Sequence, residues 1–143
     1  PEIASSFGGM EFFSTFGGNP VSCAIGMAVM DVIEKDDLQI RARNLGFRFI
    51  DGLNDLKDSH EIIGDVRGRG LFIGIEMVVN RETMKPATNE SSLLVEKMRD
   101  KEVLLSTDGP LNNVLKIKPP MVISERDVDE TLSKLDETLS EIV

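Results

Sequence analysis

Two hydrophobic periodicities alternate along the chain, and this alternation limits the possible folds more than any other feature. Residues 38–56 repeat apolar side chains at steps of three and four, which predicts an amphipathic helix. Residues 61–66 and 71–79 are short runs rich in Ile, Val and Phe, which are typical of strands. The connection between them, "RGRG", contains Gly68 and Gly70, which we expect to adopt unusual backbone angles in a hairpin. The first half of the chain therefore predicts a helix followed by a β-hairpin.

The second half of the chain repeats this change of pattern. Residues 91–101 predict a helix, and residues 103–106 and 113–119 predict a strand pair around an Asp-Gly-Pro turn. A last amphipathic helix begins after Ser124, which we expect to be its N-cap, with Asp127 completing an imperfect capping box. The segment 80–90 between the two halves is predicted to be a polar loop.

These patterns, with an apolar helix over residues 21–34, place the chain in the α+β class. We predict about four short, mostly antiparallel strands with helices on one face of the sheet, preceded by a buried helix. The 143 residues suffice for one compact domain or for part of a larger protein. The chain starts with "PEIASSFGGM" and has no initiator Met, which suggests a piece of a longer protein.

The composition and net charge of the chain limit the classes of partner that it can bind. The net charge of −9 argues against nucleic acid and against anionic membrane surfaces, and no apolar run reaches membrane-spanning length. A single cysteine, Cys23, excludes an internal disulfide framework and predicts an intracellular, reducing compartment. Cys23 lies in the apolar helix, so we expect it to be a small buried side chain without a nucleophilic role.

The segment "STFGGNPVSCAIGMAVM" joins a flexible turn to the apolar helix. Asn19 is a favoured N-cap, and Pro20 is tolerated at the first helical position. Because a helix N-terminus has free N–H groups and a partial positive charge, it can bind an anion there, with Thr15 adding a hydroxyl. A glycine-rich turn without a ligand explains the same residues equally well. A helix that is apolar on nearly every side is expected to be buried.

Few residues have the chemistry of a catalytic site. His60 is the only histidine, which nearly excludes a histidine metal site or a Ser-His-Asp relay, and we expect it to be solvated. No metal site is predicted. The glycines of "RGRGLFIG" precede a strand rather than opening a helix, so they do not form a dinucleotide-binding fingerprint.

Two pairs of cations could bind an anionic substrate. Arg67 and Arg69 fall in the predicted hairpin connection, where exposure at a hairpin tip is the simpler explanation. Lys116 and Lys118 lie two residues apart in a strand and therefore point to the same side. They can hold an anion or face water, and solvation is the commoner outcome.

Two longer segments resemble class III aminotransferases, which depend on pyridoxal 5'-phosphate (PLP). "FSTFGGNPVSCAIGMAVMDVIEKDDL" is similar to the segment after the catalytic lysine, and "DVRGRGLFIGIEMV" is similar to a strand pair of the C-terminal small domain. The resemblance implies a fold type I enzyme that acts as a homodimer. Residues 1–36 would be an interface and cofactor-phosphate segment with a linking helix, and 37–143 the small domain, without the large catalytic domain.

The same resemblance implies roles for individual residues. Thr15, with Phe16 and Gly17 beside it, would bind the PLP phosphate of the partner subunit, and the apolar helix would be buried in the dimer. The Schiff-base lysine would lie upstream of Pro1, because none of the eight lysines stands in the glycine-rich motif that carries it. We therefore expect no catalytic residue in this chain, and no turnover by the chain alone.

The segment "VLLSTDGPLNNVLKIKPPM" is similar to one branch of the family, which contains ethanolamine-phosphate phospho-lyases and alanine–glyoxylate aminotransferase 2-like proteins. Many class III enzymes have an arginine at Lys116 that holds the substrate carboxylate. A lysine is a point charge and clamps a carboxylate more weakly. Lys116 is thus the predicted substrate contact, although Leu111-Asn112 departs from the basic pair expected in this branch.

The resemblance leaves three functions open. The first is a phospho-lyase that eliminates phosphate from phosphoethanolamine or a similar phosphorylated amine. The second is an alanine–glyoxylate or omega-amino-acid transaminase, and the third is a non-catalytic dimerisation module. The expected location is intracellular, either mitochondrial or cytoplasmic.

Overall fold

The chain divides into two units, Pro1–Asp36 and Asp37–Val143, in a computed structural model that describes residues 2–9 and 13–142. The first unit contains helices α1 (Glu2–Phe7) and α2 (Pro20–Lys35). As predicted, Asn19 is the N-cap of α2: its Oδ1 accepts hydrogen bonds from the N–H groups of Val21 and Ser22, at 3.0 and 3.1 Å. Pro20 occupies the first turn, where it loses no helical hydrogen bond. The sequence did not predict α1.

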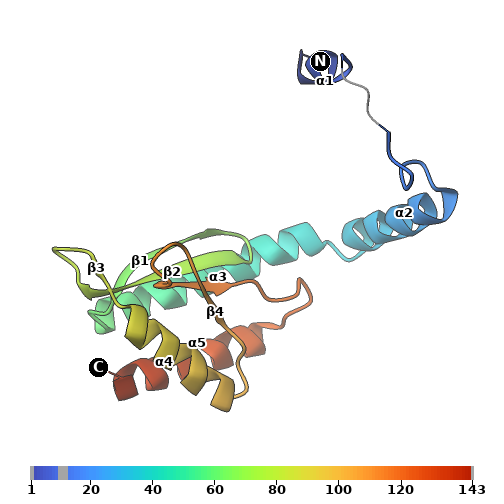
Figure 1. Cartoon of the computed structure of the whole chain (residues 1–143). Coiled ribbons are helices and arrows are strands. Elements are labelled where there is room, and N and C mark those ends of the chain that lie inside the picture. The colour runs from blue at the N-terminus through green and yellow to red at the C-terminus, as the bar shows by residue number, and fades with distance from the viewer. Residues whose placement is uncertain (1, 10–12, 143) are drawn as a thin grey trace. The chain divides into compact units, whose positions relative to one another are not determined.

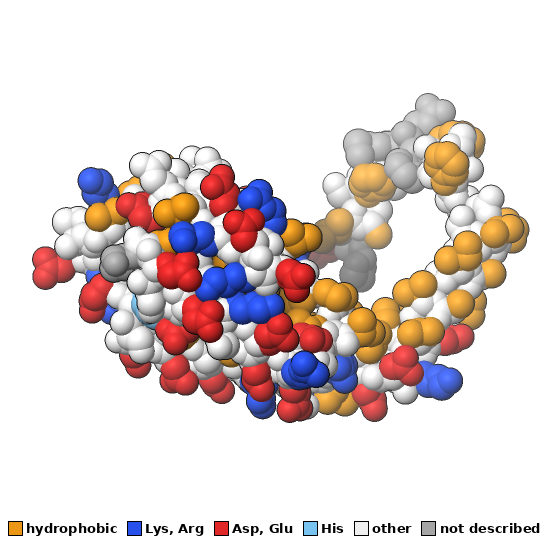
Figure 2. Space-filling model, turned by 90° about the horizontal axis from the view of Figure 1, so that it is seen from below, with side chains coloured by type: hydrophobic (Ala, Val, Ile, Leu, Met, Phe, Trp, Pro, Cys, Tyr) orange, Lys and Arg blue, Asp and Glu red, His pale blue; other side chains and the backbone are white. Residues whose placement is uncertain are grey.

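Helix α2 is not buried by the other residues of its own unit, and its burial in a dimer stays a prediction. No residue of α2 is buried, and Val21, Ile25 and Met30 are each more than 60% exposed. Figure 2 shows hydrophobic side chains along this helix. Cys23 is also exposed, so its predicted burial is wrong for this chain. The reason is that one helix cannot cover itself, and the described residues of this unit supply no second layer.

The second unit is the predicted α+β fold. Its elements are α3 (Leu38–Ser59), β1 (Ile63–Arg69), β2 (Phe72–Asn80), β3 (Lys85–Pro86), α4 (Thr88–Asp100), β4 (Ser106–Asp108), β5 (Val114–Ile117) and α5 (Glu125–Ile142). Four strands form an antiparallel sheet in the order β1-β2-β5-β4, and the two-residue β3 pairs with β2. Figure 1 shows α4 and α5 together beneath the sheet. The short β3 falls in the segment predicted to be a polar loop.

The core lies between this sheet and its three helices. Phe49 and Leu53 of α3, Ile75 of β2, Leu115 of β5 and Leu139 of α5 are all at most 1% exposed. Ile75 and Leu115 are paired across β2 and β5, which places them on the same face of the sheet. The helices therefore cover one face, as predicted, and leave the other face without a layer in this unit.

Local predictions for this unit are partly confirmed. Ser124 and Asp127 form the capping box of α5: the Asp127 N–H donates to Ser124 Oγ at 3.1 Å, and the Ser124 N–H donates to Asp127 Oδ2 at 3.0 Å. Gly70 has a φ of +56°, as expected at the hairpin, but Gly68 does not have a positive φ. Gly68 is required for space instead, because a Cβ there would lie 2.5 Å from the carbonyl oxygen of Phe72.

Two further predictions are wrong. The His60 side chain is 11% exposed rather than solvated, and its Nε2 lies 2.6 Å from Asp136 Oδ1, because the end of α3 packs beside α5. The apolar run 103–106 is a strand only from Ser106, where it begins to pair with Lys116 of β5. Among the described residues, no helix is both long and apolar enough to cross a membrane.

Candidate functional site

The open face of the sheet carries a row of residues that crosses three neighbouring strands. Arg67 of β1 is paired with Gly74 of β2, and Gly74 is paired with Lys116 of β5. Directly paired residues share a face, so Arg67 and Lys116 both lie on the side opposite the buried Ile75 and Leu115. The antiparallel register thus brings together two cations that are 49 residues apart in the sequence.

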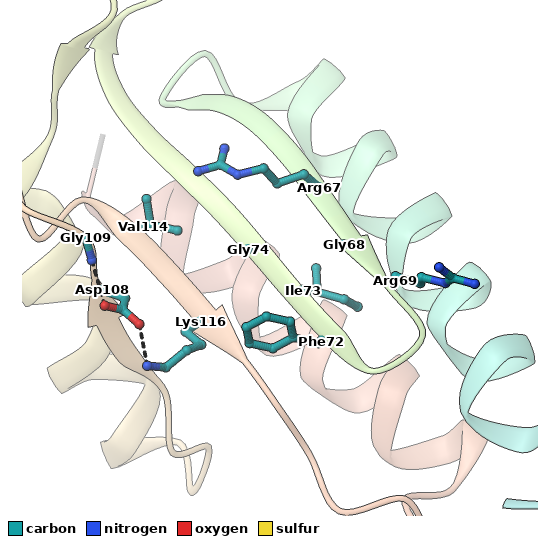
Figure 3. Close-up of a pocket in the computed structure, with 10 residues that line it drawn as sticks. All are labelled: Arg67, Gly68, Arg69, Phe72, Ile73, Gly74, Asp108, Gly109, Val114 and Lys116. Atoms are coloured by element: carbon teal, nitrogen blue, oxygen red, sulfur yellow. Dashed lines mark hydrogen bonds and ion pairs between the residues drawn. The ribbon is translucent and has the colours of Figure 1, made fainter. Parts of the chain in front are cut away.

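These residues line a pocket of about 510 Å³ on the open face (Figure 3). Phe72, which is 64% exposed, and Val114 contribute its apolar walls, while Asp108 and Lys116 contribute charge at one side. Gly74 forms the floor, and a Cβ there would lie 3.3 Å from Val114 Cγ1. Because Gly74 has no side chain, the pocket is deeper between Arg67 and Lys116.

Lys116 is paired with Asp108. Lys116 Nζ lies 2.5 Å from Asp108 Oδ2, and the Gly109 N–H donates to Asp108 Oδ1 at 2.8 Å. The hydrogen bond from Lys116 is the main cause that holds the pKa of Asp108 below its ordinary value, followed by the Gly109 N–H. The predicted substrate-binding lysine therefore carries its own counter-ion.

Arg67 is also paired on this face. Its Nη1 donates to Asp65 Oδ2 at 2.8 Å and to Glu76 Oε2 at 2.7 Å. The hydrogen bond to Asp65, and then that to Glu76, raises the pKa of the Arg67 guanidinium. Arg67 is exposed, as predicted, but it lies within β1 and not at the hairpin tip. Arg69 extends away from Lys116 (Figure 3).

Only one of the two lysines predicted to share one side of a strand lies within the strand, although the charges of both lower the pKa of Asp108. Lys116 lies in β5, which ends at Ile117, whereas Lys118 follows the end of the strand. The strand ends early because the prolines at 119 and 120 cannot extend the ladder. Only Lys116 therefore lies in the row with Arg67.

The predicted cofactor-phosphate segment lies in the first unit. The Gly17 N–H donates to Ser14 Oγ at 3.1 Å, and the carbonyl of Phe16 accepts from the Asn19 N–H at 3.3 Å. The Thr15 side chain makes no hydrogen bond to any residue in the described part of the chain, and it is exposed. Thr15 therefore lies in a turn that is stabilised by the hydrogen bonds of the residues on either side of it.

The donors available for an anion differ from those expected from the sequence. Asn19 already satisfies the N–H groups of Val21 and Ser22 at the start of α2. A bound anion would therefore use the Thr15 hydroxyl and other N–H groups of the turn, since Gly17 already donates to Ser14 Oγ and Asn19 to the Phe16 carbonyl. A hydroxyl with neighbouring amides suits the phosphate of PLP, since phosphate oxygens accept several hydrogen bonds at once. The chemistry of Thr15, Phe16 and Gly17 fits this end of the cofactor.

Two further residues of this face, Asp108 and Glu76, were not predicted from the sequence. Both lie on the open face, where they neutralise the cations that the sequence singled out. The observed register places residues 108 and 116 on the same face one diagonal step apart, whereas the sequence placed Asp108 in the turn and not in a strand. Across residues 2–9 and 13–142, no group of three or more His, Cys, Asp or Glu side chains is placed to hold a metal ion.

Comparison with known protein families shows which family the chain belongs to. The family model described as "Aminotransferase class-III" matches residues 1–139. The chain belongs to the class-III aminotransferases. Enzymes of this family carry PLP, and the small domains of their fold type I structures have the same antiparallel sheet and helices as the second unit.

Individual members of the class-III family are similar over nearly the whole chain. "Alanine--glyoxylate aminotransferase 2-like" of Drosophila melanogaster is 46% identical, over 100% of this chain and 30% of its own length. "Ethanolamine-phosphate phospho-lyase homolog 1" of Caenorhabditis elegans is 40% identical, over 97% of this chain and 30% of its own length.

A solved relative shares the fold as well as the sequence. A phospholyase from Arthrobacter, in complex with phosphoethanolamine, has a TM-score of 0.88 and 38% identity, covering 97% of this chain and 33% of its own. The chain spans about a third of the length of the class-III relatives that it matches.

Proposed function

We propose that the whole protein is a PLP-dependent phospho-lyase that eliminates phosphate from phosphoethanolamine or a similar phosphorylated amine. The observation that carries this proposal is Lys116, which stands in the pocket where the resemblance places a carboxylate-binding arginine, and which is paired with Asp108. A neutralised point charge is a poor clamp for an α-carboxylate. The similarity to a phospholyase in complex with phosphoethanolamine supports the same substrate class.

The reaction needs a proton removed from the α-carbon and a C–O bond broken at the β-carbon. PLP, when bound, supplies an electron sink for the carbanion. Phosphate leaves with the electrons of the C–O bond, and water then replaces the nitrogen. Phosphoethanolamine and one water thus yield acetaldehyde, ammonia and phosphate, without a second amino acceptor.

This chain contributes to binding rather than to bond breaking. Thr15, with Phe16 and Gly17, holds the cofactor phosphate, and Lys116 contacts the substrate. The Schiff-base lysine belongs to the part of the protein upstream of Pro1, so the chain alone is inactive. Absorption spectra of the chain mixed with PLP test this last point: a substrate-displaceable imine band would contradict it.

The exposed apolar side chains of α2 support a homodimer. Ile25, Met27 and Met30 are 61%, 66% and 69% exposed, and a contiguous apolar surface of this kind is typical of an interface. In the proposed dimer, a second copy covers α2. The location proposed for the protein is intracellular, mitochondrial or cytoplasmic, in line with its single cysteine.

A transaminase is the second candidate, and the similarity to an alanine–glyoxylate aminotransferase 2-like protein favours it. The two functions differ in their need for an acceptor. The full-length parent is incubated with PLP and phosphoethanolamine, with and without glyoxylate or pyruvate, and phosphate is measured. Release that is independent of the acceptor supports the lyase, whereas no release, together with amino transfer to the acceptor, overturns it.

A further inference from the structure

The ion pair between Lys116 and Asp108 is built into the β4–β5 hairpin. Asp108 is paired with Val114, and Lys116 is paired with Ser106, so the two charged side chains approach each other diagonally on the open face. The turn fixes the carboxylate independently, because its second oxygen accepts the Gly109 N–H. Asp108 is therefore held in place by the backbone before Lys116 contacts it.

The two cations beside Gly74 already have carboxylate partners. Around Gly74, the paired groups are two cations, Arg67 and Lys116, and three carboxylates, Asp65, Glu76 and Asp108. Arg69 also lines the pocket, but its side chain extends away from Lys116 (Figure 3). Each of the two paired cations is thus compensated by at least one carboxylate, and Lys118, beyond the end of β5, is near enough for its charge also to lower the pKa of Asp108.

We propose that Asp108 is a specificity-determining residue that keeps a substrate carboxylate away from Lys116. This inference rests on the proposed function and narrows its substrate class to amines that have a β-phosphate and no α-carboxylate. A carboxylate that approaches Lys116 must either displace Asp108 or lie beside it. Displacement breaks a charge-assisted hydrogen bond, and coexistence places two like charges around one ammonium.

The variant Asp108→Asn removes the negative charge of this side chain without changing its shape. Asparagine keeps the side-chain shape and an oxygen that can accept the Gly109 N–H, but it has no negative charge. The matched control is Asp65→Asn, which removes one negative charge from the same face. Asp65 contacts Arg67 rather than Lys116, and Arg67 keeps its second partner, Glu76.

The first test compares two substrates in the full-length parent with PLP. O-Phosphoserine differs from phosphoethanolamine only by its α-carboxylate. We expect Asp108→Asn to raise the ratio of kcat/KM for O-phosphoserine over phosphoethanolamine by about fivefold, the size of one partly exposed ion pair. The gain should come from a lower KM for O-phosphoserine, and Asp65→Asn should leave the ratio unchanged. An unchanged ratio in Asp108→Asn, or an equal loss for both substrates, overturns the proposal.

The second test does not depend on catalysis. The 143-residue chain is titrated with acetate, a minimal carboxylate, while NMR follows the side-chain signals of Lys116 at constant ionic strength. We expect Asp108→Asn to bind acetate about fivefold more tightly than the unaltered chain. Equal perturbation in both chains overturns the role of Asp108. If the parent releases no phosphate from phosphoethanolamine, the proposed function fails, and the acetate titration still decides the role of Asp108.

Discussion

Gly46 tests how closely helix α3 packs on the β1–β2 hairpin beneath the pocket. Gly46 is buried, and a Cβ built on it would lie 2.3 Å from the carbonyl oxygen of Gly70 and 2.7 Å from its Cα. The obstacle is backbone rather than the end of a flexible side chain, and Gly70 has a φ of +56° at the hairpin. Gly46→Ala must therefore push the hairpin away from the helix.

Two opposing effects determine the size of the change. Alanine is favoured over glycine inside a helix by about 1 kcal/mol, so an unobstructed substitution would stabilise α3. Overpacking a close contact costs about 1–3 kcal/mol, and contact with backbone places this site at the upper end. The difference predicts that Gly46→Ala lowers the free energy of unfolding by about 2 kcal/mol.

Urea unfolding of the chain, followed by far-UV circular dichroism, measures this difference. With a slope of about 1–3 kcal/mol per molar urea, the midpoint should fall by about 1 M. The control is Gly52→Ala, where the added Cβ would lie 2.5 Å from Leu132 Cδ1, a side-chain atom that can move, so its loss should be smaller. A Gly46→Ala midpoint equal to or above that of the unaltered chain would refute the reasoning.

Three other outcomes follow from the structure. Phe49 is 1% exposed, so Phe49→Ala leaves a cavity in the core. The substitution should lower the free energy of unfolding by about 3–5 kcal/mol, measured by the same urea titration. The hydrogen bond from the Ser124 hydroxyl lowers the pKa of Asp127. The Asp127 carboxylate therefore stabilises the fold above about pH 4, and this stabilisation is lost as the pH falls further and the carboxylate is protonated. The difference in thermal midpoint between the unaltered chain and Asp127→Asn should therefore shrink between pH 6 and pH 2; a constant difference would contradict the capping role. In the full-length parent, Ile25→Glu should shift size-exclusion elution from dimer to monomer, and an unchanged dimer would show that α2 is not at the interface.

The elements that local chemistry determines were predictable from the sequence. Asn19-Pro20 marked the start of α2, and Ser124 with Asp127 marked the start of α5, because a cap depends on residues within one turn. The alternation of hydrophobic periods likewise predicted the antiparallel sheet with helices on one face. Each of these signals is contained in a few consecutive residues.

Contacts between distant residues were not predictable in the same way. His60 contacts Asp136, which is 76 residues away in the sequence. No local sequence pattern predicts that α3 ends beside α5. The pairing of Lys116 with Asp108 depends on the register of β4 and β5, which the apolar run 103–106 placed too early. For α2, the apolar pattern predicted burial without specifying the surface that would supply it.

The most direct test of the account is the structure of the complete assembly with PLP bound. The central claim is that the Thr15 turn of one subunit binds the cofactor phosphate of its neighbour. The account predicts that Thr15 Oγ1 lies within hydrogen-bond distance, about 3 Å, of a phosphate oxygen of PLP held by the other subunit. A structure in which Thr15 lies away from every PLP phosphate would contradict it.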